Sequence, residues 1–199
     1  MKIKVQLNKM RSFVHKVAAD AKFSAAALIN SLLGFPLFFV NIYEVECWRD
    51  GVLIWSESNR NIVVNEGLDD VLDKYFKGST YTASHAVGLT TGTPTFAAGD
   101  TLASHAGWTE FTNYDEADRP DLTGDLGAVS GQSVDNTANR AVYTISTGGG
   151  TIGGAFVSVD NTKGGTTGVL YGGAAFTTDR VLAAADELRV AVTLTAATG

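Results

Sequence analysis

The sequence contains few residues whose types and spacing could do chemistry, and a glycine run is the first of them. Residues 148–153 (GGGTIG) have the G-x-G-x-x-G spacing of a dinucleotide-binding loop. Such a loop holds a pyrophosphate because the N-terminus of a helix follows it, whereas here the β-prone segment 155–159 (AFVSV) follows. The run is therefore interpreted as a turn before a strand, and we expect no nucleotide or other cofactor.

An acidic stretch at residues 115–125 could gather oxygen ligands around a calcium ion. Its carboxylates are Asp115, Glu116, Asp118, Asp121 and Asp125. Because the D-x-D-x-D-G-x5-E spacing of a calcium loop is absent, a solvated turn region is the favoured interpretation. Calcium binding by this stretch stays open.

Catalytic patterns are equally sparse. The histidines His15, His85 and His105 are too scattered to suggest a metal site, and neither a G-x-S-x-G elbow nor an H-E-x-x-H pair occurs. Glu110 and Asp115 are an acid and base that could be proposed for a cell-wall hydrolase, but no motif supports the pairing. We expect no enzymatic activity and no small-molecule substrate.

The three tryptophans allow a different kind of site. Trp48, Trp55 and Trp108 could stack on sugars, although aromatic residues beside β-branched ones are more often packed in a core. Core packing is the favoured interpretation. A receptor- or carbohydrate-binding tail module that uses Trp108 and the loop 90–126 is the alternative.

The best-defined element is a helix over residues 65–77. Five large apolar side chains recur at i, i+3, i+4, i+7 and i+8 and form one stripe: Leu68, Val71, Leu72, Tyr75 and Phe76. Asn65 is a candidate N-cap, and Gly78 suits a left-handed C-terminal cap. We expect the stripe to be buried against a sheet, so that Leu68, Leu72 and Phe76 are structural residues.

The remainder of the body has the signals of an all-β fold. The pair Asp50-Gly51 between two apolar runs predicts a hairpin. Short alternating runs at 141–146, 151–159, 168–177 and 188–194 are separated by turn signals, and the chain has 22 Gly against 3 Pro. We predict a mainly β body over residues 44–199, an antiparallel β-sandwich or jelly roll with one packed helix.

Residues 1–43 differ in composition and are predicted to form a helical arm. Residues 1–22 carry six basic groups and one acidic group, which leaves nine basic and twenty acidic groups for the rest of the chain. The expected partner-binding side chains combine charge and apolar surface: Lys9, Arg11, Phe13, Val14, Val17, Leu28, Leu32 and Leu33. Because the apolar part needs a dry groove, a neighbouring protein is favoured over nucleic acid. The uncharged run 23–43 is interrupted by Gly34-Phe35-Pro36, so membrane insertion is not favoured.

Several short motifs of this sequence together resemble those of a known protein family. They are 48–51 (WRDG) with Trp55, 61–68 (NIVVNEGL), 107–110 (GWTE) followed by Tyr114 and Arg119-Pro120, 153–156 (GGAF) and 163–171 (KGGTTGVLY). Over about residues 44–196 the chain resembles small virion proteins of tailed bacteriophages.

This resemblance implies a structural particle component at the capsid surface, the neck or the tail. Such a protein would be located in the virion, with other virion proteins and further copies of itself as partners. The G-W-T-E pattern marks no active site, so Trp108, Glu110 and Arg119 are expected to be structural.

Overall fold

The computed structural model describes residues 38–197. Its elements, in chain order, are β1 (Phe38–Arg49), β2 (Val52–Arg60), β3 (Ile62–Val63), α3 (Asn65–Val71), the π-helical turn η1 (Leu72–Phe76), β4 (Ala86–Thr91), β5 (Glu110–Phe111), the 3-10 turn η2 (Thr123–Asp125), β6 (Ser133–Asp135), β7 (Ala141–Thr144), β8 (Gly150–Ser158), β9 (Leu170–Leu182) and β10 (Glu187–Ala197).

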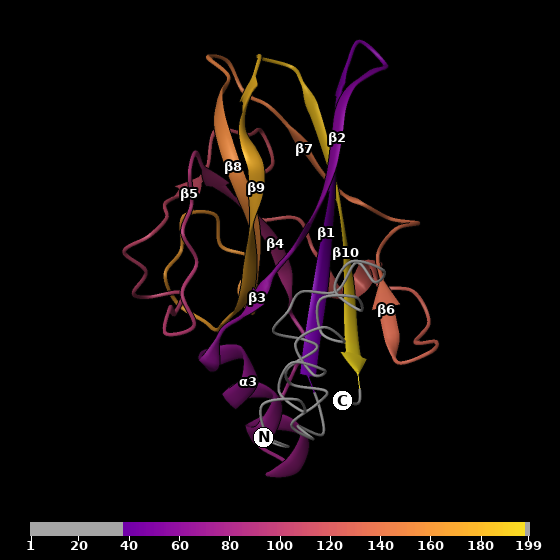
Figure 1. Cartoon of the computed structure of the whole chain (residues 1–199), viewed down its shortest axis with the longest axis vertical. Coiled ribbons are helices and arrows are strands. Elements are labelled where there is room, and N and C mark those ends of the chain that lie inside the picture. Colours follow the sequence, from indigo (N-terminus) through magenta and orange to yellow (C-terminus); the bar gives the residue numbers. More distant parts are fainter. Residues whose placement is uncertain (1–37, 198–199) are drawn as a thin grey trace, which may run out of the picture. The chain divides into compact units, whose positions relative to one another are not determined.

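The strands form two antiparallel sheets, which confirms the predicted mainly β fold. The first has the order β2-β1-β10-β6, with β7 also paired to β10, and the second has the order β3-β9-β8-β4-β5 (Figure 1). The predicted arm helices lie outside the described residues. Strand β1 begins at Phe38, so the last residues that we assigned to the arm belong to the β body.

The hairpin between β1 and β2 forms where the sequence predicts it. Asp50 and Gly51 have φ values of 50° and 75°, and Arg49 pairs with Val52 across the turn. Two successive left-handed residues are the requirement of a type I′ turn, whose twist matches that of the flanking strands.

The core lies between the two sheets. Tyr43 and Val45 of β1 and Val87 and Leu89 of β4 are fully buried in one apolar cluster. The Tyr43 hydroxyl donates to the carbonyl of Gly172 in the opposite sheet at 3.2 Å. This contact between sheets satisfies a polar group that burial would otherwise make costly.

A second apolar layer covers the other face of the β4-β8-β9 sheet. Val87 and Leu89 face the core, so Gly88 between them faces outward. There the ring of Phe156 lies against Gly88, where a Cβ atom would approach it to 2.1 Å. Trp108, from the long segment between β4 and β5, packs on this ring, and Phe96 of the same segment packs on Trp108. That segment is therefore a structural cover for the sheet as well as a surface loop.

Helix α3 is attached to the sheet by residues that the sequence analysis did not select. A Cβ atom on Gly67 would lie 2.5 Å from the carbonyl oxygen of Tyr171, so only glycine allows the helix to approach β9 this closely. Beside it, Glu66 Oε2 accepts hydrogen bonds from the backbone N–H groups of Leu102 and Leu170 at 3.1 and 2.7 Å. The N-cap is Val64, without a side-chain cap, instead of Asn65.

Candidate functional site

The residues of the G-W-T-E motif and the Arg-Pro pair meet in a buried ion pair. Arg119 is 1% exposed, and its Nε and Nη2 atoms donate to the two carboxylate oxygens of Glu110 at 2.9 and 2.6 Å. The other donors bind Ser158 Oγ and the carbonyls of Asp160 and Gly165. All five N–H donors of the guanidinium are thus used in holding loops together, as expected for a structural residue.

Trp108 is also a packing residue. It is 7% exposed, and its indole stacks on the ring of His105 with centroids 3.6 Å apart. Its Nε1 donates to the Asp100 carboxylate at 3.2 Å. Both faces and the polar edge of this indole contact the protein itself, so Trp108 offers no platform for a sugar. The alternative of a receptor- or carbohydrate-binding module therefore cannot rely on Trp108 in this structure.

The two other tryptophans are covered by cations of the same chain. The Arg189 guanidinium lies 4.9 Å from the Trp48 ring centroid, and the Arg180 guanidinium lies 5.0 Å from that of Trp55. These distances are those of intramolecular cation–π contacts.

Three of the acidic residues proposed for hydrolysis or calcium binding have partners within the chain. Glu110 is neutralised by Arg119, and Asp115 accepts a hydrogen bond from the Ser146 hydroxyl. Glu116 accepts from the backbone N–H of Thr144 at 3.0 Å. Within residues 38–197, no cluster of three or more His, Cys, Asp or Glu side chains has a geometry that could hold a metal ion.

The surface of α3 and η1 is the strongest candidate for function. Leu72, Tyr75 and Phe76 are 54%, 80% and 71% exposed, and Leu68 is also exposed, so the prediction that this stripe is buried against the sheet was wrong. Only Val71 of the stripe packs against the core. The physical reason is that Glu66 and Gly67 form the side facing the sheet, which turns the remaining apolar side chains outward.

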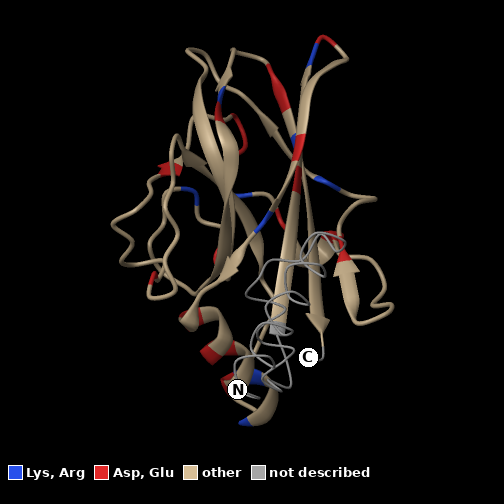
Figure 2. Cartoon of the chain, in the orientation of Figure 1, with Lys and Arg blue, Asp and Glu red and all other residues tan. Residues whose placement is uncertain are grey.

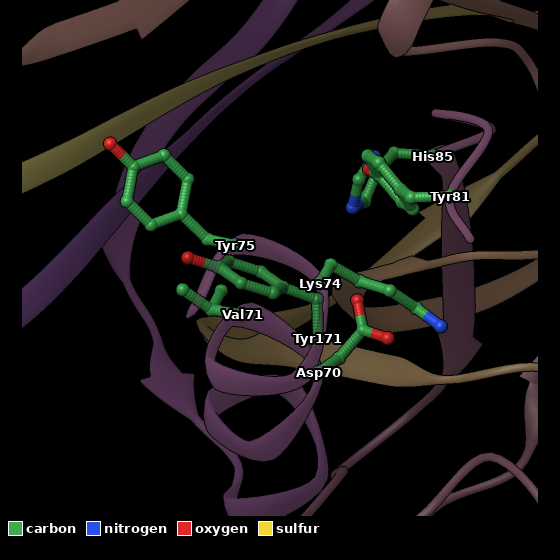
Figure 3. A pocket seen from close by; sticks show the side chains of 7 residues that line it. All are labelled: Asp70, Val71, Lys74, Tyr75, Tyr81, His85 and Tyr171. Atoms are coloured by element: carbon green, nitrogen blue, oxygen red, sulfur yellow. The ribbon is translucent and has the colours of Figure 1, made fainter. Parts of the chain in front are cut away.

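A cavity of about 250 Å³ lies beside this exposed face. Its lining comes from the helix, from the segment before β4 and from β9: Asp70, Val71, Lys74, Tyr75, Tyr81, His85 and Tyr171 (Figure 3). The Tyr81 hydroxyl lies 3.3 Å from His85 Nδ1, and the rings of His85 and Tyr171 meet edge to face with centroids 6.2 Å apart. Aromatic rings therefore form much of the wall.

The charges of the cavity are unevenly matched. Lys74 pairs with Asp73 at 3.4 Å instead of with Asp70, the partner that helical spacing predicts. No hydrogen bond or ion pair joins the Asp70 side chain to any other residue of the described body. Burial lowers the pKa of His85 below its usual 6.5, against the opposing influence of Asp70 and Asp121. Burial thus favours the neutral form of this imidazole, and the Asp70 carboxylate is a lining charge without an ion pair within residues 38–197.

Sequence reasoning located the helix but missed this cavity. Tyr81 and His85 are four residues apart, a spacing that indicates a shared face only in a helix, and this segment is not helical. Tyr171 is remote from both in the sequence. The predicted arm residues cannot be compared with the site because Lys9, Arg11, Phe13, Val14, Val17, Leu28, Leu32 and Leu33 all lie outside the described residues.

The described residues contain no helix with the length and apolarity needed to cross a membrane. A scan against models of protein families gives no match to this chain. A search of curated proteins gives no match either.

Proposed function

We propose that the chain is a structural component of a tailed-phage virion, in a capsid decoration, neck or tail position, and that it assembles through contacts between subunits. The motifs between Trp48 and Tyr171 resemble those of small virion proteins, and this resemblance supports the proposal that the chain is part of a virion particle. The proposal that the chain assembles through subunit contacts rests on the exposed apolar face of α3 and η1, which is formed by Leu72, Tyr75 and Phe76.

These three large apolar side chains lie together on the face of α3 and η1, whereas the exposed apolar residues of most protein surfaces are isolated from one another. Full burial of one such side chain contributes about 1.5–3 kcal/mol, and each of these has more than half of its surface still to bury. Their combined gain is therefore about 3–6 kcal/mol. Association costs about 4–15 kcal/mol in lost freedom of motion, so this face needs additional contacts or many repeated copies to hold a complex together.

Location in the virion is tested by immunogold electron microscopy of purified particles of the phage or prophage that encodes the chain. We expect regularly spaced label on the capsid, neck or tail. Particles without label, together with glycan or host-cell binding by the free protein, would replace the proposal with the receptor-binding alternative.

The contribution of the apolar face is tested by replacing Tyr75 and Phe76 with Ser. A matched control replaces Val129 and Val181, which are 76% and 77% exposed at other places on the body, with Ser. Only the first variant should lose incorporation into particles while keeping the thermal midpoint of the parent. Equal incorporation of both variants would show that the α3–η1 face is not a subunit contact.

A further inference from the structure

We propose that the cavity beside α3 binds a Lys or Arg side chain from the basic stretch 2–22 of a second copy of the chain. This inference rests on the proposed assembly function and names the partner of its surface. It is carried by the chemistry of the cavity, by the opposite charges of the two surfaces and by the length of chain that precedes Phe38.

The cavity has the composition of a site for an organic cation. The rings of Tyr75, Tyr81, Tyr171 and His85 line it, and Asp70 and Lys74 complete its charged side (Figure 3). The faces of aromatic rings attract ammonium and guanidinium groups, most strongly where water is excluded. An unpaired carboxylate repels an anionic ligand and attracts a cation. These features select a positively charged side chain as the occupant.

Lys74, the one Lys or Arg among the described lining residues, does not form an ion pair with Asp70. Lys74 forms its ion pair with Asp73, which also pairs with Lys77 at 2.8 Å. The neighbouring Asp69 is exposed and, like that of Asp70, its side chain has no hydrogen bond or ion pair within residues 38–197. Acidic residues follow one another along α3 (Figure 2). The surface around the cavity is thus apolar with unneutralised negative charge.

The complementary set of side chains belongs to the same sequence. Residues 1–22 carry six basic groups against Asp20 alone, and Phe13, Val14 and Val17 lie among them. A segment with both features can place a cation in the cavity while its apolar side chains cover Leu72 and Phe76. Combining charge with apolar burial meets the need for more contact than the apolar face alone provides.

The reach of the chain allows this contact between two copies. Lys22 precedes Phe38 by sixteen residues, which span about 50 Å when extended. A folded body of this length has a radius of gyration of about 15 Å. Since every copy carries one basic stretch and one cavity, two copies can exchange stretches reciprocally, or the contact can be repeated head to tail around a ring or along a surface.

The first test compares two charge-neutralising variants of the full chain by sedimentation velocity over a range of concentrations. We expect Asp70→Asn to weaken self-association at least tenfold, and Asp69→Asn, the same change one residue away and outside the cavity lining, to weaken it less than threefold. Equal effects of the two variants would mean that only the general charge of the helix matters and would overturn the cavity contact. A parent protein that stays monomeric at every concentration would also overturn it, whereas immunogold labelling decides the particle function separately.

The second test identifies the occupant. A photoreactive benzoylphenylalanine replaces Leu72, at the edge of the exposed face, and unlabelled chains are mixed with ¹⁵N-labelled chains before irradiation. We expect cross-linked peptides that join position 72 of one isotopic form to residues 2–22 of the other. Cross-links confined to one isotopic form would assign the contact to the chain's own segment and overturn the proposal, as would cross-links that avoid residues 2–22.

Discussion

Replacing Arg119 with Met should destabilise the fold more than any other single charge removal in the described body. The side chain is 1% exposed and makes five hydrogen bonds, two of them to Glu110, whose side chain is 10% exposed. Methionine has a similar length and fills the space, so packing changes little. Breaking a buried pair by removing one partner costs about 3–5 kcal/mol, because the remaining charge stays buried without compensation.

The assay is equilibrium unfolding of the full chain in urea at pH 7. With a slope of about 2 kcal/mol per molar, a loss of 4 kcal/mol moves the midpoint down by about 2 M. The matched control is Arg189→Met, because Arg189 pairs with Glu187 at 2.5 Å while their side chains are 41% and 40% exposed. An exposed pair is worth about 0–1 kcal/mol, so the control midpoint should move by less than about 0.5 M.

A second variant separates the unpaired charge from lost packing. Because Arg119→Met with Glu110→Gln leaves no carboxylate to be buried alone, this double variant should be more stable than Arg119→Met. If the two single changes simply add, or if the Arg119 and Arg189 variants shift equally, burial of the Glu110 carboxylate is not what makes this pair important.

Three further outcomes follow from burial and charge. Leu72→Asp should change the free energy of unfolding by less than about 1 kcal/mol, since surface substitutions are usually small; failure to fold in a circular dichroism melt would mean that this side chain is buried after all. Trp108→Ala should cost about 3–5 kcal/mol as other large core truncations do, and an unchanged urea midpoint would contradict its role as cover of the second sheet. Because the folded-state pKa of His85 lies below its unfolded value, the unfolded chain binds the proton first, so stability should fall as the pH decreases below about 6.5. His85→Gln should lose this part of the pH dependence between pH 7.5 and 5.5, while a parallel fall in variant and parent would assign it to other groups.

Local signals in the sequence account for the elements that were predicted well. The hairpin at Asp50-Gly51 forms because both turn residues tolerate positive φ and the runs on either side alternate. In contrast, β6 (Ser133–Asp135) has no apolar alternation and is a strand only because it pairs with residues 193–195 of β10. A pairing over that separation leaves no trace in a short window of sequence.

The helix shows a different limit of sequence reasoning. Its position was predicted from the spacing of its apolar residues, but an amphipathic stripe indicates only that a surface needs covering. It does not distinguish the sheet of the same chain from another molecule. The side that contacts the sheet was decided by Gly67, where the missing Cβ allows contact with β9, and by Glu66, which accepts two backbone N–H groups.

The cavity lay beyond prediction for a related reason. Its aromatic lining comes from the helix, from the segment that holds Tyr81 and His85 and from β9 at Tyr171, and these segments meet only when the sandwich is complete. No periodicity or motif joins them in the sequence. The i,i+4 spacing predicts the pairing of Asp73 with Lys77, but it does not predict that Lys74 also pairs with Asp73 and not with Asp70.

The placement of the carboxylates argues that stability and assembly use separate parts of this molecule. Glu110 is neutralised inside the body by Arg119, and the Arg49 guanidinium bound to Asp186 holds the pKa of that buried carboxyl below 3.8. The Arg49–Asp186 pair joins segments far apart in the chain, and Arg119 also donates to Ser158, Asp160 and Gly165, so these contacts fix the sandwich. Asp69 and Asp70 have no such partner within the described residues and stand on the helix whose apolar side chains are also unburied. Neither feature stabilises the isolated body, and both match the basic and apolar partner that we propose.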